Sequence, residues 1–315
     1  MMQYLFGQAN MSESMNSENI KNLYEKIKSA DAIFIGAGSG LSTSAGYDYG
    51  ARRLIKYFPD FIKKYNFKDL YSAGFYSFPT YEEYFAYWSR MSYINRYVKD
   101  PKPVYKELYE LVKDKNYFVI TTNVDHCFQK AGFNKQRLFY TQGDMGLWQC
   151  STPCHQSTYD NENNVRQCLL SQGFTFDQEG ELIVPDESNL KMQVPTELVP
   201  LCPKCGKPMR DHLRSDSQFV QDEGWYAAQT RYNAFVKNHT KGKVLYLDLG
   251  SGGNTPIIFK IPFMRMVHQN PEAIYATINL GEAITTEEIA DRSICLNADI
   301  GAAVSALLKL KEAKA

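Results

Sequence analysis

The sequence lacks several features that would predict a membrane or nucleic-acid partner. No apolar run approaches the roughly 20 residues that a transmembrane helix needs. Lys and Arg number 35, and Asp and Glu also number 35, so no excess charge predicts a polyanionic partner. Residues 1–19 are polar and lack the basic start and apolar centre of a signal peptide. We therefore expect a cytoplasmic protein that binds neither nucleic acid nor membrane, with a flexible tail over residues 1–19.

Cysteine is scarce, and its spacing does not suggest a disulfide framework. Four of the seven cysteines form two close pairs, Cys150 with Cys154 and Cys202 with Cys205. Such paired thiolates are typical ligands of tetrahedral zinc, and four sulfurs leave no coordination position open. We therefore predict a structural zinc ion and a reducing compartment. The alternative is that His155, next to Cys154, replaces one sulfur as a ligand.

A lysine is missing from the most glycine-rich stretch of the chain. Residues 32–35 are a short apolar run that predicts a buried strand, and four glycines follow between residues 36 and 46. Glycine allows close backbone approach, and a strand entering such a loop is a common binding site for a dinucleotide pyrophosphate. The absence of the lysine expected in G-x-x-x-x-G-K-[ST] disfavours hydrolysis of nucleoside triphosphates. A glycine cluster alone is also compatible with a simple turn.

Polar residues follow a second predicted strand at residues 117–120. Asn123 and Asp125 come shortly after its end. At the carboxyl end of a buried parallel strand, such side chains point into the ligand crevice of an open α/β sheet. Both are also good N-cap residues, so the alternative is that they cap a helix predicted over residues 125–131.

Three later predicted strands, at residues 244–249, 273–278 and 293–296, also end in small or polar residues. Strands that alternate with helices and end in this way indicate an α/β fold with a doubly wound parallel, Rossmann-like sheet. An inserted smaller domain of helices carries the zinc-binding module. The domain of residues 20–315 is predicted to divide into a sheet part of about 20–50, 100–140 and 215–315, a helical insert of about 51–99 and a zinc module of about 141–214.

Aromatic residues crowd the segment from residue 52 to about residue 98. We interpret this segment as a helical insert whose rings fill a small core. The alternative is that some of the rings line a substrate channel.

Taken in order, these motifs resemble the sirtuin family over about residues 32–308. The loop that begins at Gly36 resembles the first NAD loop of that family, and Asp48-Tyr49 resembles its Asp-Phe pair. Asn123 and Asp125 match two positions of its Gln-Asn-Ile-Asp motif. The resemblance implies that Asn123 holds the NAD ribose and a water molecule, and that Asp125 orients the nicotinamide amide or the ribose.

The later motifs match the same family. The cysteine pairs match its zinc module, residues 250–255 resemble its Gly-Thr-Ser loop, and Ile278-Asn279 resembles the pair that meets the adenosine. NAD is therefore implied as the substrate. The implied NAD-binding residues are Gly36, Ala37, Gly38, Ser39, Gly40, Leu41, Ser42, Asp48, Tyr49, Asn123, Asp125, Gln142, Gly250, Ser251, Asn254, Thr255, Asn279, Leu280, Asp299 and Ile300.

Three departures separate the chain from sirtuins that remove acyl groups. Gln142-Gly143 stands where those enzymes have His-Gly, residues 209–213 replace the Phe-Gly-Glu stretch that docks acyl-lysine, and Gly40 is an additional glycine. These features resemble class M, the macrodomain-linked sirtuins. That class implies protein ADP-ribosyl transfer to a lipoylated carrier similar to the glycine cleavage H protein. It also implies a macrodomain hydrolase as functional partner.

The glutamine at position 142 matters for the chemistry. A deacylase needs a base that draws a proton from a ribose hydroxyl, and an amide has no usable pKa. Loss of a general base costs a factor of about 10²–10⁴. Direct attack by an acceptor carboxylate needs no such base, so we predict catalysis of transfer by Asn123, Asp125 and Gln142.

Three other functions compete with this prediction. They are an NAD glycohydrolase, a weak NAD-dependent deacylase and a non-catalytic sensor of NAD or ADP-ribose. His126 is the alternative base for deacylation, although helical geometry would turn its side chain away from that of Asp125.

Overall fold

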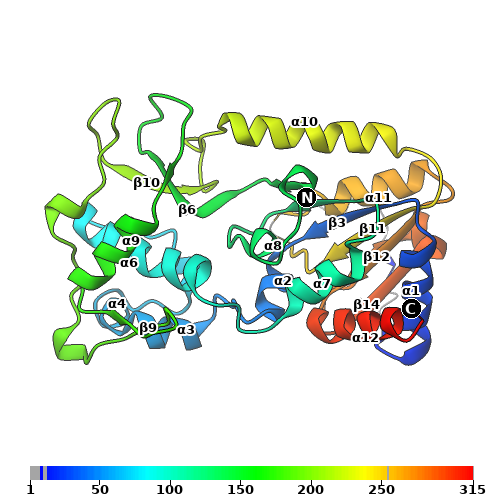
Figure 1. Ribbon diagram of the computed structural model, residues 1–315, viewed down its shortest axis with the longest axis horizontal. Helices are drawn as coiled ribbons and strands as arrows, with labels where there is room; N and C mark the ends of the chain where they lie inside the picture. Colours follow the sequence, from blue (N-terminus) through cyan, green and yellow to red (C-terminus); the bar gives the residue numbers. More distant parts are fainter. Residues whose placement is uncertain (1–7, 10–12, 254, 315) are drawn as a thin grey trace.

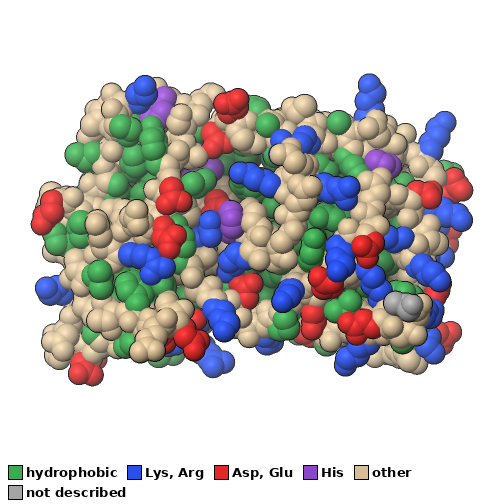
Figure 2. Space-filling view, in the orientation of Figure 1, with side chains coloured by type: hydrophobic (Ala, Val, Ile, Leu, Met, Phe, Trp, Pro, Cys, Tyr) green, Lys and Arg blue, Asp and Glu red, His purple; other side chains and the backbone are tan. Residues whose placement is uncertain are grey.

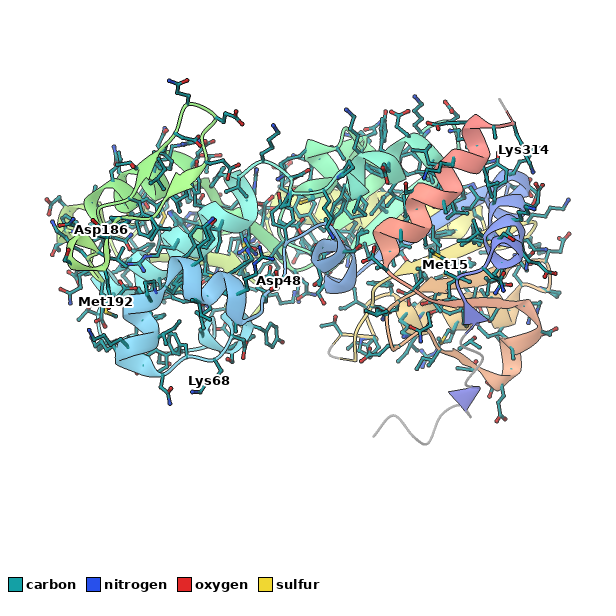
Figure 3. All side chains as sticks on the ribbon, turned by 90° about the horizontal axis from the view of Figure 1, so that it is seen from below. Met15, Asp48, Lys68, Asp186, Met192 and Lys314 are labelled. Atoms are coloured by element: carbon teal, nitrogen blue, oxygen red, sulfur yellow. The ribbon has the colours of Figure 1, made fainter. Side chains whose placement is uncertain are left out.

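The computed structural model describes residues 8–9, 13–253 and 255–314, and it has two lobes side by side (Figure 1). The larger lobe contains a parallel sheet with helices on both faces. The smaller lobe combines short helices with a three-stranded sheet. Figure 3, turned by 90°, shows Asp48 at the junction of the lobes.

The sheet of the larger lobe confirms the predicted α/β fold with a Rossmann-like sheet. Every neighbouring pair of its strands is parallel, and Ile35 lies between Leu247 on one side and Val119 on the other. The seven strands follow the order β2 (Glu13–Ser14), β14 (Ser293–Asn297), β12 (Ile274–Ile278), β11 (Val244–Leu249), β3 (Ala32–Ala37), β4 (Tyr117–Thr121) and β5 (Leu138–Tyr140).

The helices that cover this sheet are α1 (Ser17–Ser29), α7 (Val104–Val112), α10 (Glu223–Asn238), α11 (Lys260–Gln269) and α12 (Ile300–Glu312). Ile33 and Ile35 of β3 share one apolar cluster with α1, α7 and α12. Phe34, between them in sequence, packs on the opposite face with α10 and α11. Because alternate residues face opposite sides, β3 is apolar throughout its length and buried on both faces.

The start of the chain takes part in sheet pairing. β1 (Gln8–Ala9) pairs antiparallel with β13 (Thr285–Thr286), and β2 pairs with β14 at the edge of the large sheet. The flexible tail predicted over residues 1–19 therefore includes two segments whose backbone is hydrogen-bonded. Its last residues belong to α1, which begins at Ser17 because the Asn16 side chain accepts the N–H of Asn19 at 2.8 Å.

An aromatic core holds the smaller lobe together. The ring of Phe58 lies 6.0 Å from that of Phe61 and 5.0 Å from that of Tyr87. The elements of this lobe are α3 (Ala51–Tyr57), α4 (Pro59–Tyr65), α5 (Leu70–Ala73), α6 (Tyr81–Ser92), the π-helix η1 (Tyr93–Tyr97), β6 (Gly143–Cys150), β7 (Tyr159–Asp160), α9 (Glu162–Ser171), β8 (Thr175–Phe176), β9 (Leu182–Ile183), η3 (Glu187–Asn189), η4 (Thr196–Leu198) and β10 (Met209–Leu213). The remaining short helices lie in the larger lobe and are α2 (Ser39–Ser44), α8 (Cys127–Lys130), η2 (Lys135–Arg137) and η5 (Glu287–Arg292).

The surface carries both signs of charge, and the helices are those of a chain without long apolar runs. Figure 2 shows acidic and basic side chains interspersed over one face of the molecule. Within the described ranges, no helix is both long enough and apolar enough to cross a membrane.

One buried cation joins three parts of the smaller lobe. The Arg90 side chain is fully buried, and its guanidinium binds the two carboxylate oxygens of Asp60 at 2.6 and 2.7 Å. It also donates to the Gln172 side chain at 2.7 Å and to the Lys191 carbonyl at 3.0 Å. Arg90 therefore links α4, α6 and the segment around α9.

We expect Arg90→Met to lower the free energy of unfolding by about 3–5 kcal/mol, because the Asp60 carboxylate would lose its buried partner. Urea unfolding followed by circular dichroism measures this change. Lys63→Met is the control, since its ion pair with Glu187 at 3.6 Å is exposed and its loss should leave stability nearly unchanged. Equal stability of the two variants would contradict the role of Arg90.

Candidate active site

A cavity of about 950 Å³ lies between the lobes and is lined from both. Its size is near the upper end of the range of about 300–1,000 Å³ that ligand pockets occupy. The loops that line it follow the carboxyl ends of β3, β4, β5 and β11, as expected for a ligand site in a parallel α/β sheet. The predicted site residues that line it are Gly38, Ser39, Tyr49, Asn123, Gln142 and Thr255.

The two glycine-rich loops meet backbone to backbone at this edge of the sheet. The N–H of Gly38 donates to the Leu249 carbonyl, and the N–H of Gly40 donates to the Gly250 carbonyl, both at 3.0 Å. A Cβ added at Gly40 would lie 2.7 Å from the Cα of Gly250, which itself has a φ of +72°. The additional glycine at position 40 is therefore required by the contact between the loops.

Three other predicted residues of the first loop pack against the core. A Cβ added at Gly36 would lie 2.3 Å from the ring of Phe259. The Ala37 carbonyl accepts the hydroxyl of Thr121 at 2.9 Å, and Leu41 is fully buried. None of the three lines the cavity, so their contacts support the loop from behind.

Asn123 lies in the cavity wall with its amide held by two neighbours. Its Nδ2 donates to the Gly38 carbonyl at 2.9 Å and to the Tyr105 hydroxyl at 3.2 Å. Only 9% of the residue surface is exposed. These bonds fix the plane of the amide and tie the end of β4 to the first glycine loop.

Asp125 lies behind the cavity wall and is not among the residues that line it. Its carboxylate accepts the Ser42 hydroxyl at 2.5 Å and the N–H of Cys127 at 3.0 Å. Burial raises the pKa of Asp125, and the hydrogen bonds from Ser42 and Cys127 offset this only in part. Ser42 also shares a 2.8 Å hydrogen bond with the Tyr105 hydroxyl, so Asp125 is connected to Asn123 through two hydroxyls.

Helix capping accounts for one contact of Asp125 and for none of the side-chain hydrogen bonds of Asn123. The residue before α8 is His126, which has the left-handed φ of +65°. The His126 side chain accepts no N–H of the helix, and its ring binds Asp144 instead. Asp125 does bind the first N–H of α8, so its carboxylate serves both the local turn and Ser42.

Gln142 follows β5 and lines the same cavity as Asn123. Its side-chain amide donates to the Thr141 hydroxyl at 3.3 Å, and its backbone carbonyl accepts the N–H of Arg214 at 3.0 Å. Thr141 in turn donates its N–H to the Thr121 carbonyl at 2.9 Å, which places the two loops side by side. Within the described part of the chain, no histidine lines this cavity.

A buried carboxylate supports the second glycine loop. Asp248 accepts the Ser251 hydroxyl at 2.5 Å and the Tyr275 hydroxyl at 2.8 Å. Burial raises the pKa of Asp248, against the opposing effects of Lys260 and of these hydrogen bonds. The Ser251 carbonyl then accepts the amide of Asn279 at 3.0 Å, so the predicted residues Ser251 and Asn279 are in direct contact.

The remaining predicted residues do not line the cavity. Asp48 accepts the N–H of Gly50 at 2.9 Å, and Leu280 is 74% exposed. Asp299 caps α12 and accepts the Ser44 hydroxyl at 2.8 Å, and Ile300 is buried as the first residue of that helix. The predicted residue Asn254 lies outside the described residues.

The aromatic segment, for which the sequence left two interpretations, fills the lobe core and also contributes rings to the cavity wall. Phe58 and Phe61 are fully buried in the lobe core. Tyr71, Phe75 and Tyr81 are between 46% and 59% exposed and line the cavity. The smaller lobe therefore gives the cavity an aromatic wall.

Charged residues of the cavity wall were missed in the sequence. Arg210, Asp211 and Arg214 line it, at the position where the Phe-Gly-Glu stretch is absent. The guanidinium of Arg214 lies 4.5 Å from the centre of the Phe219 ring. The Asp211 carboxylate accepts the Tyr84 hydroxyl, and burial raises the pKa of Asp211. Residues 210–216 are rich in charge, but nothing in this local pattern indicates that the segment faces a cavity.

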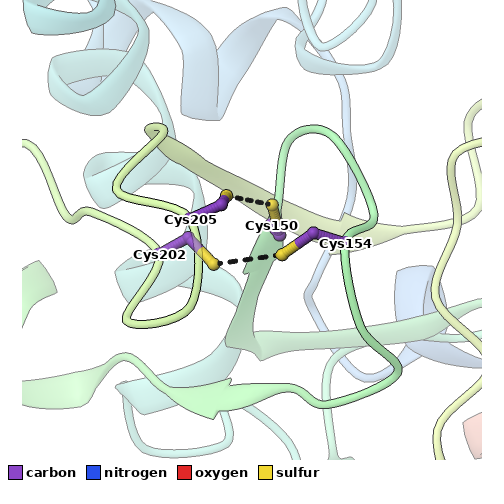
Figure 4. Close-up of side chains that lie close together, drawn as sticks. All are labelled: Cys150, Cys154, Cys202 and Cys205. Carbon is purple, nitrogen blue, oxygen red and sulfur yellow. Dashed lines mark hydrogen bonds between the residues drawn. The ribbon is translucent and has the colours of Figure 1, made fainter.

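The four paired cysteines converge as predicted, at one end of β6 and β10 (Figure 4). Sγ atoms lie 3.6 Å apart in the pairs Cys150–Cys205 and Cys154–Cys202, and all four lie within 4.8 Å of one another. Sulfurs bound to tetrahedral zinc at about 2.3 Å are about 3.8 Å apart. The cluster thus fits a zinc ion with four sulfur ligands and no open position.

His155 lies beside this cluster rather than within it. Its Nδ1 is 3.0 Å from the Cys154 Sγ, and its Nε2 is 2.7 Å from the Tyr159 hydroxyl. The geometry fits a hydrogen bond to a thiolate, which is the usual way a neighbouring group orients a metal ligand.

We expect Cys202→Ser to lose the metal and to lower the melting temperature by roughly 10 °C, because metal binding contributes to folding. Elemental analysis and thermal unfolding with and without a chelator measure both effects. Cys168→Ala, in the core of the same lobe but outside the cluster, should retain its metal. If wild type with chelator, wild type without chelator and Cys202→Ser all melt at the same temperature, the zinc assignment is contradicted.

Two known proteins resemble this chain in sequence over most of its length. No model of a known protein family matches the chain. The chain is 37% identical over 284 residues to "Protein ADP-ribosyltransferase" of Staphylococcus aureus, covering 90% of this chain and 85% of the relative. It is 30% identical over 300 residues to a "Probable bifunctional ADP-ribose hydrolase/ADP-ribosyltransferase" of Fusarium oxysporum, covering 90% of this chain and 47% of that protein.

Solved structures share the fold at low sequence identity. A Sir2 homolog–NAD complex aligns with a TM-score of 0.60 over 98% of both chains at 14% identity. Sir2 bound to an acetylated peptide aligns with a TM-score of 0.57 over 93% of this chain and 98% of that chain at 15% identity. These similarities establish the architecture alone.

Proposed function

Because the chain belongs to the sirtuin-type protein ADP-ribosyltransferases, we propose that it cleaves NAD and transfers ADP-ribose to a protein acceptor, with little or no deacylase activity. One observation carries the choice between transfer and deacylation. Asn123 and Gln142 line the same cavity, and none of the described residues that line it is a histidine. The wall therefore offers hydrogen bonds to a ribose but no imidazole base.

NAD is the substrate of the proposed reaction. The bond between ribose C1′ and the nicotinamide nitrogen breaks, and nicotinamide leaves with the electron pair. The sugar becomes positively charged, and a carboxylate oxygen of the acceptor forms the new C1′–O bond. No proton is lost in this step, so transfer proceeds without a general base at position 142.

Asn123 and Asp125 have different places in this proposal. Asn123 lines the cavity with its amide plane fixed, so it is the residue that contacts the ribose and the nicotinamide side of the site. Asp125 acts from behind through Ser42, and its carboxylate adds negative potential near the sugar cation. Gln142 orients the ribose by hydrogen bonding.

The proposed acceptor is a lipoylated carrier similar to the glycine cleavage H protein, with a macrodomain ADP-ribosyl hydrolase as functional partner. The class M resemblance of Gln142 and Gly40 motivates this assignment. An aromatic cavity wall with Tyr71, Phe75 and Tyr81 suits an apolar arm that enters from the smaller lobe. The Fusarium relative, whose name combines an ADP-ribose hydrolase with a transferase, favours a paired hydrolase.

We expect Asn123→Ala to reduce nicotinamide release at least about 100-fold, because a preorganised dipole at the reacting ribose is lost. Chromatography of nicotinamide measures the rate, while metal content and melting temperature should match wild type. Asn233→Ala, on the exposed side of α10, is the matched control and should keep full activity. Undiminished turnover by Asn123→Ala would remove the assigned role.

Mass spectrometry of a lipoylated carrier protein, incubated with this chain and NAD, tests the function itself. We expect a mass gain of one ADP-ribose on the carrier and no loss of acetyl from an acetyl-lysine peptide in a parallel reaction. Free ADP-ribose with an unmodified carrier would indicate an NAD glycohydrolase. Loss of acetyl would indicate a deacylase, and an absence of nicotinamide would indicate a sensor.

A further inference from the structure

His126, Asp144 and Arg96 form a group that the proposed chemistry does not use. His126 directs Nδ1 to the Asp144 carboxylate at 2.6 Å, and the other oxygen of Asp144 accepts Nε of Arg96 at 3.0 Å. The N–H of Gly146 also donates to Asp144 at 2.7 Å. None of these residues lines the large cavity.

The Asp144 carboxylate is buried and ionised. Burial by itself would raise the pKa of Asp144, but the hydrogen bond from His126 and the charges of His126 and Arg96 bring it below its ordinary value of 3.8. The residue is only 4% exposed, so these bonds form in a region of low dielectric. Loss of either partner would leave a buried carboxylate incompletely paired.

The backbone of His126 adds a second observation. Its φ of +65° is a left-handed conformation that non-glycine residues rarely adopt, and the only other described example is Asn66. A residue is held in such a conformation when surrounding contacts require it. Here the contact is with Asp144, across the space between two loops.

The three residues belong to three separate segments. His126 follows the turn that carries Asn123, and Asp144 lies two positions after Gln142 at the start of β6. Arg96 belongs to the π-helix η1 of the smaller lobe. The N–H of Met145 donates to the Val124 carbonyl at 2.9 Å, so the backbone joins the first two segments in the same place.

We propose that His126, Asp144 and Arg96 are positioning residues that hold the segment carrying Gln142 beside the segment carrying Asn123 and hold the smaller lobe in contact with both. This inference rests on the proposed transferase function. After nicotinamide leaves, either an acceptor carboxylate or a water molecule forms the bond to C1′, and attack by water releases one proton. A closed junction keeps water out and favours the protein acceptor, so a loosened junction diverts the reaction to hydrolysis.

Two substitutions at position 126 separate the hydrogen bond from the backbone conformation. His126→Gly keeps the left-handed backbone but removes the bond to Asp144. His126→Asn also tolerates that backbone and retains a side-chain donor. His268→Asn, on the exposed last turn of α11, is the control for histidine replacement.

The measurement is the ratio of free ADP-ribose to ADP-ribosylated carrier, formed from NAD and the lipoylated carrier. This ratio does not depend on the fraction of folded enzyme, so a purely structural effect would not change it. We expect His126→Gly to raise the ratio about tenfold, which corresponds to about 1.4 kcal/mol between two competing barriers. His126→Asn and His268→Asn should give ratios near that of wild type.

Arg96→Gln provides an independent check from the opposite side of Asp144. It should raise the ratio in the same direction as His126→Gly. An unchanged ratio in both variants, with a wild type that modifies the carrier, would overturn this inference and leave the proposed function intact. A wild type that forms only free ADP-ribose would overturn both, and an equal increase in His126→Asn would show that the hydrogen bond is not the cause.

Discussion

The close approach of two glycine-rich loops is the constraint on which the site depends. The hydrogen bond from Gly40 to the Gly250 carbonyl joins the loops that follow β3 and β11, two neighbouring strands of the sheet. The Asn123 amide donates a hydrogen bond to the Gly38 carbonyl. The Asn279 amide donates to the Ser251 carbonyl in the second loop. Asn123 and Asn279 are therefore both positioned relative to one backbone junction, where a side chain larger than hydrogen does not fit.

The strands that are buried at every position could be predicted from the sequence. β3, β4 and β11 are buried along their whole length, and this burial appears in the sequence as short apolar runs. α10 was not predicted, because Ala228 is its one fully buried residue and its other side chains are only partly covered. α11 was not predicted either, because Pro262 suggests a break in the sequence. In the structure this proline lies in the first turn of the helix, where proline is tolerated. β5 has only three residues, too few for a periodic signal.

The site was predictable where it depends on the ends of single strands. Asn123 follows β4, whose apolar run is visible in the sequence, whereas Gln142 follows the three-residue β5 and was identified only through the family resemblance. Arg214 and Tyr71 line the cavity only because the smaller lobe folds back over the sheet edge, and no local pattern contains that information. The hydrogen bond between Ser42 and Asp125 also joins residues that are 83 positions apart in the sequence. Such contacts belong to tertiary structure.

The smaller lobe also has a consequence for biosynthesis. The Tyr84 hydroxyl meets Asp211, 127 positions later, and the larger sheet receives β11 only after the smaller lobe has been translated. While the chain is emerging from the ribosome, β3 therefore has its partner β4 but not β11. One apolar strand edge stays open throughout that interval, and unpaired edges of this kind join other strands readily. Stalled or truncated chains that end before residue 244 would thus present a surface for chaperones or for aggregation.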